Sequence, residues 1–278
     1  MHTKVLIVGC GDLGQALATQ LDPARYEVCG LRRSPRSLPG FTLLQGDVTQ
    51  PTTLNALQSL HPEILVYCVA ADAQTDASYK AHYVDGLRHV LEALDAVRLQ
   101  HIFLVSSTRV YGQKGDDLLD ETVSAIAADF GGERLLEAEA LLKPLACGTT
   151  VLRLSGIYGP GRTRMLRLAQ EPESWPVENH WSNRIHRDDA AGFMAYLIER
   201  AVAAKPIEDC YIVTDDAPVS QLEVLNWIAA QMGVLHSVNN APVTGGKRLS
   251  NRRLRATGFQ LTYPDYRAGY AALLEMTR

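Results

Sequence analysis

Near its N-terminus the chain reads Lys4-Val5-Leu6-Ile7-Val8-Gly9-Cys10-Gly11-Asp12-Leu13-Gly14, an apolar run followed directly by Gly-x-Gly-x-x-Gly. In such a pattern the first glycine permits a tight turn, Gly11 lets the backbone approach a pyrophosphate, and Gly14 lets the next helix pack closely. A strand before it, an alanine-rich helix over residues 15–21 and a second strand over 26–31 give the motif its context. The sequence predicts a dinucleotide-binding turn whose helix N–H groups face the phosphates. The alternative is a glycine-rich structural turn.

Composition limits the classes that need to be considered. The chain has 278 residues, 46% of them hydrophobic, and a net charge of −4. This is enough for one large core, or for one core with a smaller lobe. No apolar segment reaches about eighteen residues and no basic, then apolar leader begins the chain, so we expect no membrane span, no signal peptide and a cytoplasmic location. The charge argues against nucleic-acid binding. The five scattered cysteines indicate packed, reduced thiols and no metal site.

Strand-like and helix-like segments alternate in the first half of the chain. Strands are predicted at residues 5–8, 27–31, 42–45, 64–68, 101–106 and 150–154, and helices at 14–21, 52–60, 77–99 and 127–142. This alternation is typical of an α/β protein with a Rossmann-like, doubly wound parallel sheet, which binds ligands at the carboxyl ends of its strands. We predict a cofactor-binding domain over 1–160, to which 186–214 returns with a helix at 188–200. A smaller C-terminal substrate lobe is predicted over 161–185 and 215–278.

The end of the second strand bears on which cofactor is bound. It reads Leu31-Arg32-Arg33-Ser34 and lacks the carboxylate that holds the ribose hydroxyls in NAD-selective sites. Two guanidinium groups and a hydroxyl can neutralise and hydrogen-bond a phosphate. The sequence therefore favours NADP(H) over NAD(H), although an exposed arginine pair at a strand end would look the same.

Further segments resemble the extended short-chain dehydrogenase/reductases in their order and spacing. They read Gly46-Asp47-Val48, Val69-Ala70-Ala71, Tyr83-Val84-Asp85-Gly86, Val105-Ser106-Ser107-Thr108-Arg109-Val110-Tyr111-Gly112, Leu152-Arg153-Leu154-Ser155-Gly156-Ile157-Tyr158-Gly159-Pro160-Gly161 and Asn183-Arg184-Ile185-His186-Arg187-Asp188-Asp189-Ala190. Two features depart from the usual extended members, which carry Gly-x-x-Gly-x-x-Gly at the first turn and an Asn where Asp85 stands. The three-glycine spacing of this chain is similar to the atypical branch of that family. From the motif and this resemblance the cofactor-binding residues are predicted to be Gly9, Gly11, Asp12, Leu13, Gly14, Arg32, Arg33, Ser34, Asp47, Val48, Val69, Ala70, Ala71, Ser106, Arg134, Ser155, Gly156 and Ile157.

The same resemblance makes the catalytic residues unusual. The family uses a Tyr-x-x-x-Lys pair, in which the lysine lowers the pKa of the tyrosine that moves the proton, and a Ser or Thr that orients the substrate oxygen. Ser107 matches the Ser/Thr, but Phe130 and Arg134 stand where the pair is expected. Catalytic candidates are thus Ser107, Tyr111 and Arg134. The groups that could replace the missing acid are Tyr111, Tyr158, His186, Asp129 and Glu133, each of which has a plain structural alternative in packing or in capping a helix.

The substrate side is less specific. The resemblance implies that Thr108, Tyr158, Arg162, Arg184 and His186 line a small-molecule substrate site, and its arginines suggest an anionic substrate. A basic run over residues 247–255 lies nearby in sequence, although it suits a solvated surface equally well.

Three functions remain open from the sequence. One is an NADP(H)-dependent oxidoreductase or epimerase acting on a carbonyl or nucleotide-sugar-like substrate. Another is an NADP(H)-binding sensor or scaffold with little turnover, and the third is a non-redox isomerase or lyase. The resemblance also implies that a homodimer could form through the helices at 77–99 and 127–142.

Overall fold

The computed structural model describes residues 2–34, 41–237 and 241–276, which form two compact units. Unit 1 comprises Met1–Gly112, Ala125–Arg153 and Ala191–Tyr211, and unit 2 comprises Gln113–Ser124, Leu154–Ala190 and Ile212–Arg278. The sequence analysis placed residues 113–124, 154–160, 186–190 and 212–214 in the first domain, whereas the structure places them in unit 2. The cofactor and substrate roles given to the two parts of the chain stay predictions.

Within the described residues, seven strands form the main sheet in the order β11-β7-β5-β4-β1-β2-β3. Their bounds are β1 (Thr3–Val8), β2 (Tyr26–Arg32), β3 (Thr42–Gln45), β4 (Ile64–Tyr67), β5 (His101–Ser107), β7 (Gly148–Leu154) and β11 (Cys210–Val213). Strand β1 pairs in parallel with β2 on one side and with β4 on the other, so that Val5 lies opposite both Val28 and Ile64. The strand order reverses at β1 and β4, which confirms the predicted doubly wound sheet.

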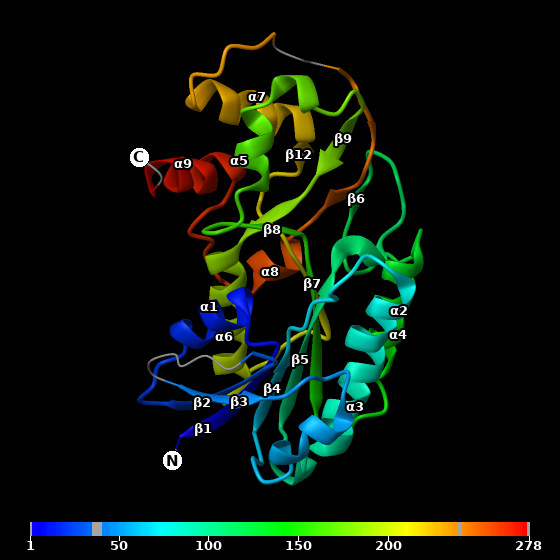
Figure 1. The fold of residues 1–278 in the computed structure, drawn as a ribbon, viewed down its shortest axis with the longest axis vertical. Helices are drawn as coiled ribbons and strands as arrows, with labels where there is room; N and C mark the ends of the chain where they lie inside the picture. The colour runs from blue at the N-terminus through cyan, green and yellow to red at the C-terminus, as the bar shows by residue number, and fades with distance from the viewer. Residues whose placement is uncertain (1, 35–40, 238–240, 277–278) are drawn as a thin grey trace. The chain divides into compact units, whose positions relative to one another are not determined.

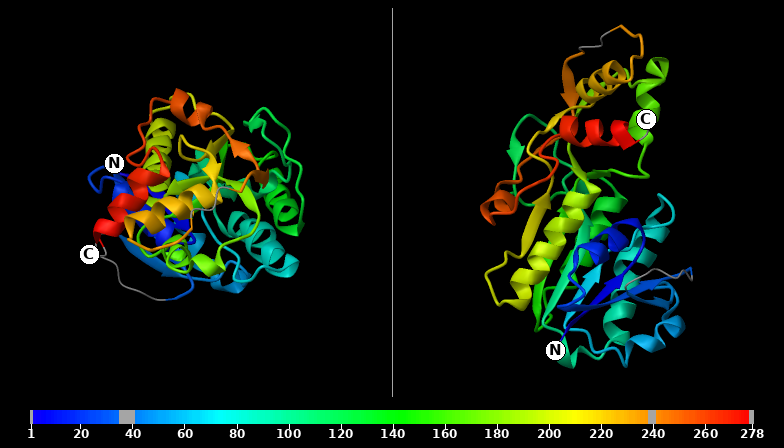
Figure 2. Two further views of the ribbon diagram at one scale, coloured as in Figure 1. Left: turned by 90° about the horizontal axis from the view of Figure 1, so that it is seen from above. Right: turned by 90° about the vertical axis from the view of Figure 1, so that its left-hand side faces the viewer.

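Helices cover both faces of this sheet. They are α1 (Asp12–Gln20), α2 (Asp76–Tyr79), a π-helical segment η3 (Lys80–Asp85), α3 (Gly86–Ala93), α4 (Phe130–Ala140) and α6 (Arg187–Val202), with 3₁₀ turns η1 (Pro51–Thr53), η2 (Asn55–Leu57), η4 (Ala96–Arg98) and η5 (Thr108–Val110). Helices α1 and α6 lie on one face and α3 and α4 on the other (Figures 1 and 2). The helix predicted at 188–200 is confirmed as α6.

Two helix predictions were wrong, one in the type of helix and one in its length. The segment 52–60 forms the turns η1 and η2, because the buried residues Leu54 and Leu57 are three apart, a spacing that a 3₁₀ turn satisfies as well as an α-helix. The long helix predicted at 77–99 ends at Ala93. There Leu94 adopts an extended conformation, and the Asp95 side chain accepts the N–H of Val97 to begin a separate turn.

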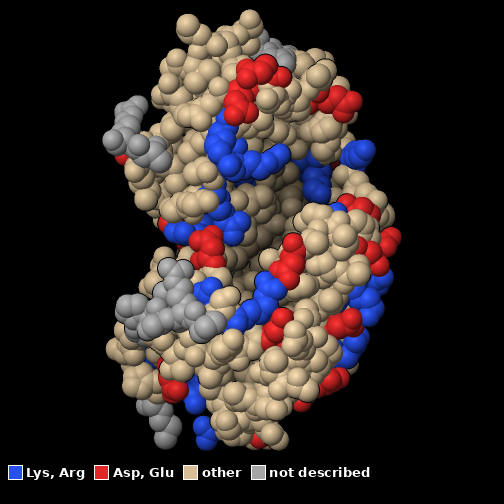
Figure 3. Space-filling view, in the orientation of Figure 1, with Lys and Arg blue, Asp and Glu red and all other residues tan. Residues whose placement is uncertain are grey.

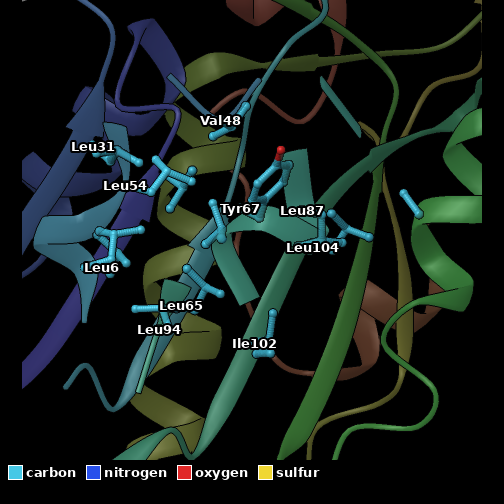
Figure 4. Close-up of a cluster of buried hydrophobic side chains, with 14 of the residues drawn as sticks. Leu6, Leu31, Val48, Leu54, Leu65, Tyr67, Leu87, Leu94, Ile102 and Leu104 are labelled. Carbon is cyan, nitrogen blue, oxygen red and sulfur yellow. The ribbon is translucent and has the colours of Figure 1, made fainter. Parts of the chain in front are cut away.

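The core of unit 1 follows from the alternation of side chains along its strands. Leu6, Leu65 and Ile102 lie on neighbouring strands, point to the same face and are fully buried together with Leu87 of α3 (Figure 4). Because successive strand residues point to opposite faces, the alternate positions face the helices on the other side. Truncating one of these leucines to alanine would cost about 2–5 kcal/mol. This packed face fixes the ends of the strands, where the candidate residues of unit 1 lie.

Unit 2 is built from short elements. Its strands are β6 (Leu118–Leu119), β8 (Gly156–Tyr158), β9 (Asn179–Ser182), β10 (Arg184–His186), β12 (Val219–Ser220), β13 (Val243–Gly245) and β14 (Arg248–Leu249), and its helical segments are α5 (Arg164–Ala169), η6 (Pro172–Ser174), α7 (Gln221–Gln231), α8 (Arg252–Ala256) and α9 (Tyr266–Met276). Its core joins α5, α7 and α9, with Tyr158 stacked on Tyr270 at 4.6 Å between ring centroids. The parallel pair β8–β10 places Tyr158 opposite His186.

Two surface properties follow from the described residues. No helix among them has both the length and the apolar character needed to cross a membrane. Acidic and basic side chains both occur on the face shown in Figure 3. Many charged side chains of the described residues are joined in ion pairs, such as that between Arg25 and Glu199 at 3.0 Å.

Candidate functional site

The three glycines after β1 have three different surroundings. Gly9 has φ +86°, and a Cβ there would lie 2.7 Å from the backbone of Cys68 and Val69, so that only glycine fits. A Cβ at Gly14 would lie 3.0 Å from the carbonyl oxygen of Gly9 and 3.1 Å from Ile7, which shows how tightly α1 packs on β1. A Cβ at Gly11 would meet nothing nearer than the Gly9 oxygen at 3.9 Å. The backbone therefore turns at Gly9, packs at Gly14 and is open at Gly11.

Helix α1 begins at this open position. Gly11 is its N-cap residue, and among the described residues no side-chain hydrogen bond caps the helix. The N–H groups of a first helical turn lack intrahelical partners and carry the positive end of the helix dipole. The start of α1, which includes Asp12 and Leu13, is therefore suited to an anionic group.

Two cysteines surround this turn without being reactive. Burial raises the pKa of the Cys10 thiol to about 11 and that of the Cys68 thiol to about 12. The Cys68 thiol donates to the Gly9 carbonyl oxygen at 3.2 Å. Both thiols therefore stay protonated at neutral pH and serve as packing groups, in line with the reduced thiols predicted from the sequence.

The two arginines at the end of β2 differ in their hydrogen bonding. The Nη1 atom of Arg32 is buried and has no hydrogen-bond partner among the described residues. Arg33 donates to both carboxylate oxygens of Asp72, through Nη2 at 2.7 Å and through Nη1. These hydrogen bonds hold the pKa of Asp72 below its usual value, and the same carboxylate lies 3.2 Å from Nε2 of His82. Ser34 is exposed, and the six residues after it lie outside the described part of the chain.

The segments after β3 and β4 carry residues that the sequence analysis predicts to bind the cofactor. One carboxylate oxygen of Asp47 accepts the backbone N–H and the hydroxyl of Thr49, which fixes the loop. Val48 is buried, and its carbonyl oxygen lies 2.7 Å from Nδ1 of His89. Val69, Ala70 and Ala71 begin two residues after the end of β4 and remain partly or fully exposed. Val69 adjoins Gly9, as the close approach at that glycine shows.

A buried polar network lies behind the end of β5. Ser106 donates to Oε1 of Glu139 at 2.6 Å, and Arg153 binds the other oxygen of that carboxylate at 2.6 Å. Arg153 also donates to the hydroxyl of Tyr111 at 2.7 Å, and Tyr111 is 1% exposed. Ser107 is only partly buried, and its hydroxyl accepts the N–H of residue 109 at 3.2 Å. Ser107 is thus partly exposed, whereas Ser106 and Tyr111 are buried.

The first turn of α4 shows where the predicted substitutes lie. Asp129 caps the helix by accepting a backbone N–H at 2.9 Å, and Phe130 is the first helical residue. One turn later, Arg134 donates to both oxygens of Asp76 at 2.7 and 3.0 Å and to Glu137 at 2.7 Å. The side chains at the two positions matched to the Tyr-Lys pair are therefore an aromatic ring without a polar atom and a guanidinium held by two carboxylates.

Two residues that contact Phe130, namely Tyr79 and Arg109, were not predicted as site residues from the sequence. The Phe130 ring meets that of Tyr79 edge-on at 5.5 Å, and the guanidinium carbon of Arg109 lies 5.1 Å from its centroid. Thr108, which precedes that arginine, is buried and begins the turn η5. Position 109 lies inside a segment quoted for the family resemblance, but no spacing rule connects it to Phe130.

The unit 2 candidates gather around β8 and β10. The Ser155 hydroxyl donates to the carbonyl oxygen of Val213 at 3.3 Å, and in β8 Gly156 is exposed and Ile157 is partly exposed. Arg162 follows on the loop after β8 and forms an isolated bridge with Gly159.

Next to that strand pair lies a buried cluster of rings and charges. The ring of His186 lies 5.2 Å from that of Tyr158, whose pKa burial raises. Arg184 is 4% exposed, and its Nη1 has no partner among the described residues. Asp215, which the sequence did not single out, is 1% exposed, and burial raises its pKa to about 7. Oδ2 of Asp215, like Nη1 of Arg184, has no hydrogen-bond partner in the part of the chain that the structure describes.

Comparisons with known proteins agree with this geometry. A model of the NAD dependent epimerase/dehydratase family matches residues 5–214. The solved structure described as "putative NAD-dependent epimerase/dehydratase from methylobacillus flagellatus" is 53% identical, covers 100% of both chains and has a TM-score of 0.91. No curated protein matches the chain.

Two more distant structures share the fold. One is the enzyme WbmG of Bordetella bronchiseptica in complex with NAD and UDP, with 17% identity over 99% of this chain and 94% of that chain and a TM-score of 0.81. The other is the UDP-glucose 4-epimerase of Thermus thermophilus in complex with NAD, with 19% identity over 96% of each chain and a TM-score of 0.75.

Proposed function

Because the chain belongs to the NAD-dependent epimerase/dehydratase family, we propose that unit 1 binds NADP(H), with NAD(H) as the weaker alternative. We propose further that the protein is an oxidoreductase or epimerase-like enzyme for a carbonyl or nucleotide-sugar-like substrate. The observation that carries the cofactor proposal is the glycine turn, which is open at Gly11 and leads into a helix without a side-chain cap. Bound there, the nicotinamide would supply hydride chemistry that amino-acid side chains lack.

The residues present fit this cofactor in their chemistry. The first turn of α1 would hold the pyrophosphate, and Asp47 keeps a second carboxylate oxygen beyond its bonds to Thr49. Arg32, with a buried nitrogen that lacks a partner among the described residues, supports a phosphate on the adenosine ribose. Arg33 would assist only in competition with Asp72. A 2′-phosphate would thus contribute two charge-assisted contacts that a ribose hydroxyl cannot replace.

The proposed reaction would run without the usual tyrosine. Phe130 has no proton to exchange, and Arg134 would have to share its guanidinium between the ribose hydroxyls and two carboxylates. Ser107, partly exposed at the carboxyl end of β5, is the group that could orient a substrate oxygen. The proton would then come from a group other than residue 130. Substituting Tyr79 or Arg109, which contact the Phe130 ring, should change the rate of reaction with the substrate more than it changes cofactor affinity.

The test is a pair of fluorescence titrations with NADPH and NADH on the wild type, Arg32→Ala and Arg33→Ala. We expect NADPH to bind more tightly, and Arg32→Ala to weaken NADPH about tenfold or more while changing NADH little. Arg25→Ala, an exposed arginine at the opposite end of β2, is the matched control. An unchanged ratio of the two affinities in both site variants would contradict the NADP(H) assignment, and no binding of either nucleotide would contradict the proposed function.

A second candidate function is a cofactor-binding sensor or scaffold with little turnover. The observation that favours it is the same pair of residues, Phe130 without a polar atom and Arg134 engaged by Asp76 and Glu137. The two functions separate on whether bound NADPH is oxidised by any member of a panel of carbonyl compounds and sugar nucleotides. Oxidation with one of them supports the enzyme.

A further inference from the structure

Arg109 occupies an unusual place at the carboxyl end of β5, in the turn η5. Its guanidinium carbon lies 4.9 Å from the ring centroid of Tyr79 and 5.1 Å from that of Phe130. The two rings themselves meet edge-on at 5.5 Å. A cation over an aromatic face is stabilised by the ring quadrupole, and here two rings contribute. The guanidinium is therefore held beside the residue that stands at the expected tyrosine position.

Most of its hydrogen-bond donors are already engaged. Nε lies 3.0 and 3.1 Å from the two carboxylate oxygens of Asp129, and Nη1 donates to Oε1 of Gln74 and to the hydroxyl of Tyr79, each at 2.7 Å. A guanidinium has five N–H donors. The two on Nη2 have no partner among residues 2–34, 41–237 and 241–276, and the side chain is 29% exposed. One nitrogen of a rigidly held fork is thus left to meet a ligand.

The helix next to it is shaped to admit this arginine. A Cβ at Gly131 would overlap Cζ of Arg109 and lie 2.5 Å from its Nε, closer than any side chain can stand. Glycine within a helix is less favourable than alanine. Gly131 is nevertheless the second residue of α4, and the guanidinium of Arg109 occupies the space that a side chain at this position would fill.

We propose that Arg109 binds the reacting oxygen of the substrate through Nη2, at the place where the family resemblance implies a tyrosine hydroxyl. This rests on the proposed function of unit 1. A guanidinium stays charged at every accessible pH, so it cannot give up a proton, but it stabilises negative charge on a carbonyl or carboxylate oxygen. A donor held in advance by its neighbours does so without reorganising. Tyr79, Gln74 and Asp129 are then positioning residues for Arg109.

A purely structural arginine would make a different pattern of contacts. An arginine that only ties Asp129 and α4 to the end of β5 needs Nε and Nη1, and both are used for that purpose. It would gain nothing from an Nη2 that has no partner among the described residues. A structural role and a ligand-binding role of Arg109 therefore differ in one respect: only the second requires Nη2 to donate a hydrogen bond to a ligand oxygen.

The experiment uses the full chain saturated with NADPH and oxamate as the probe, since oxamate carries a carboxylate next to an unreactive carbonyl. Oxamate binding is measured by isothermal titration for the wild type, Arg109→Gln, Gly131→Ala and the control Arg25→Gln. We expect Arg109→Gln to weaken oxamate about tenfold or more, as loss of a hydrogen bond to a charged group does, and to leave NADPH affinity unchanged. The control should bind like the wild type.

Gly131→Ala keeps the charge of Arg109 but places a methyl group where its guanidinium lies. Because alanine favours the helix, this variant keeps the proposal testable if Arg109→Gln fails to fold. We expect it to weaken oxamate to a similar degree at an unchanged melting temperature. The proposal is overturned if the wild-type holoprotein does not bind oxamate, or if both variants bind it as the wild type does. Failure of NADPH itself to bind would instead remove the proposed function, on which this inference depends.

Discussion

A helix of unit 1 begins at the glycine turn after β1 and another at the first turn of α4. The two helix starts differ in whether side chains occupy the polar groups there. At the glycine turn, no side chain caps the helix and the space at Gly11 is open. At α4, Asp129 caps the helix, and the guanidinium groups of Arg109 and Arg134 are largely engaged by carboxylates and other acceptors. Holding a dinucleotide requires that side chains be absent, whereas moving a proton requires one particular side chain. A chain can therefore keep the first property while the second is rebuilt.

The largest effect should come from comparing Gly9→Ala with Gly11→Ala. At position 9 the new Cβ would clash with immovable backbone at positive φ, so we expect a loss of about 2–5 kcal/mol in the free energy of unfolding. At position 11 the Cβ has space, so stability should stay within about 0.5 kcal/mol while NADPH affinity falls about tenfold or more. Urea unfolding and NADPH titration measure both. Equal losses of stability would show that the two glycines do not have separate roles.

Unit 2 offers a test of what unpaired polar groups cost. Burial raises the pKa of Asp215 to about 7, and Oδ2 of Asp215 has no hydrogen-bond partner among the described residues. Because the folded-state pKa exceeds the unfolded value, the native state binds more protons between the two, and stability falls as pH rises from about 4 to about 7. The difference in unfolding free energy between the wild type and Asp215→Asn should therefore change by a few kcal/mol over this range, with the wild type losing stability relative to the variant as pH rises. A difference independent of pH would contradict the shift.

A smaller effect is expected at the start of α4. Asp129→Ala removes the helix cap and the carboxylate that holds Arg109, which should cost about 1–2 kcal/mol of stability. Cofactor affinity should not change, because the glycine turn is untouched. Thermal unfolding with and without NADPH measures both quantities. A large loss of NADPH affinity would mean that α4 helps to hold the cofactor directly.

The smallest effect is expected at Asp72. Asp72→Asn releases Arg33 from its bidentate ion pair, so we expect NADPH to bind about threefold to tenfold more tightly, without a matching gain for NADH. In an Arg33→Ala background the same substitution should have no effect on NADPH. A gain that persists in this background would show that Asp72 acts on the cofactor by another route.

The sequence predicted the sheet well because the strands are short, apolar and bounded by turn residues. The segment 42–45 is β3 to the residue, and the glycine turn has the three surroundings that its spacing implies. The helix predicted at 52–60 failed because the spacing of Leu54 and Leu57 suits two kinds of helix. Length and period alone do not separate them.

The contacts around the candidate residues could not be predicted, because their partners are distant in sequence. Arg33 and Asp72 are 39 residues apart, and Arg134 and Asp76 are 58 apart. The spacing of motifs shows which residues reach the sheet edge. It does not show which carboxylate has already engaged an arginine there.

We propose that this chain binds a dinucleotide in unit 1 while its proton chemistry does not depend on a tyrosine at position 130. A crystal structure of the protein with NADPH tests it most directly. We predict the pyrophosphate at the first turn of α1 beside Gly11, and the 2′-phosphate in contact with Arg32. A nucleotide bound elsewhere, or with its 2′-phosphate away from Arg32, would contradict the claim.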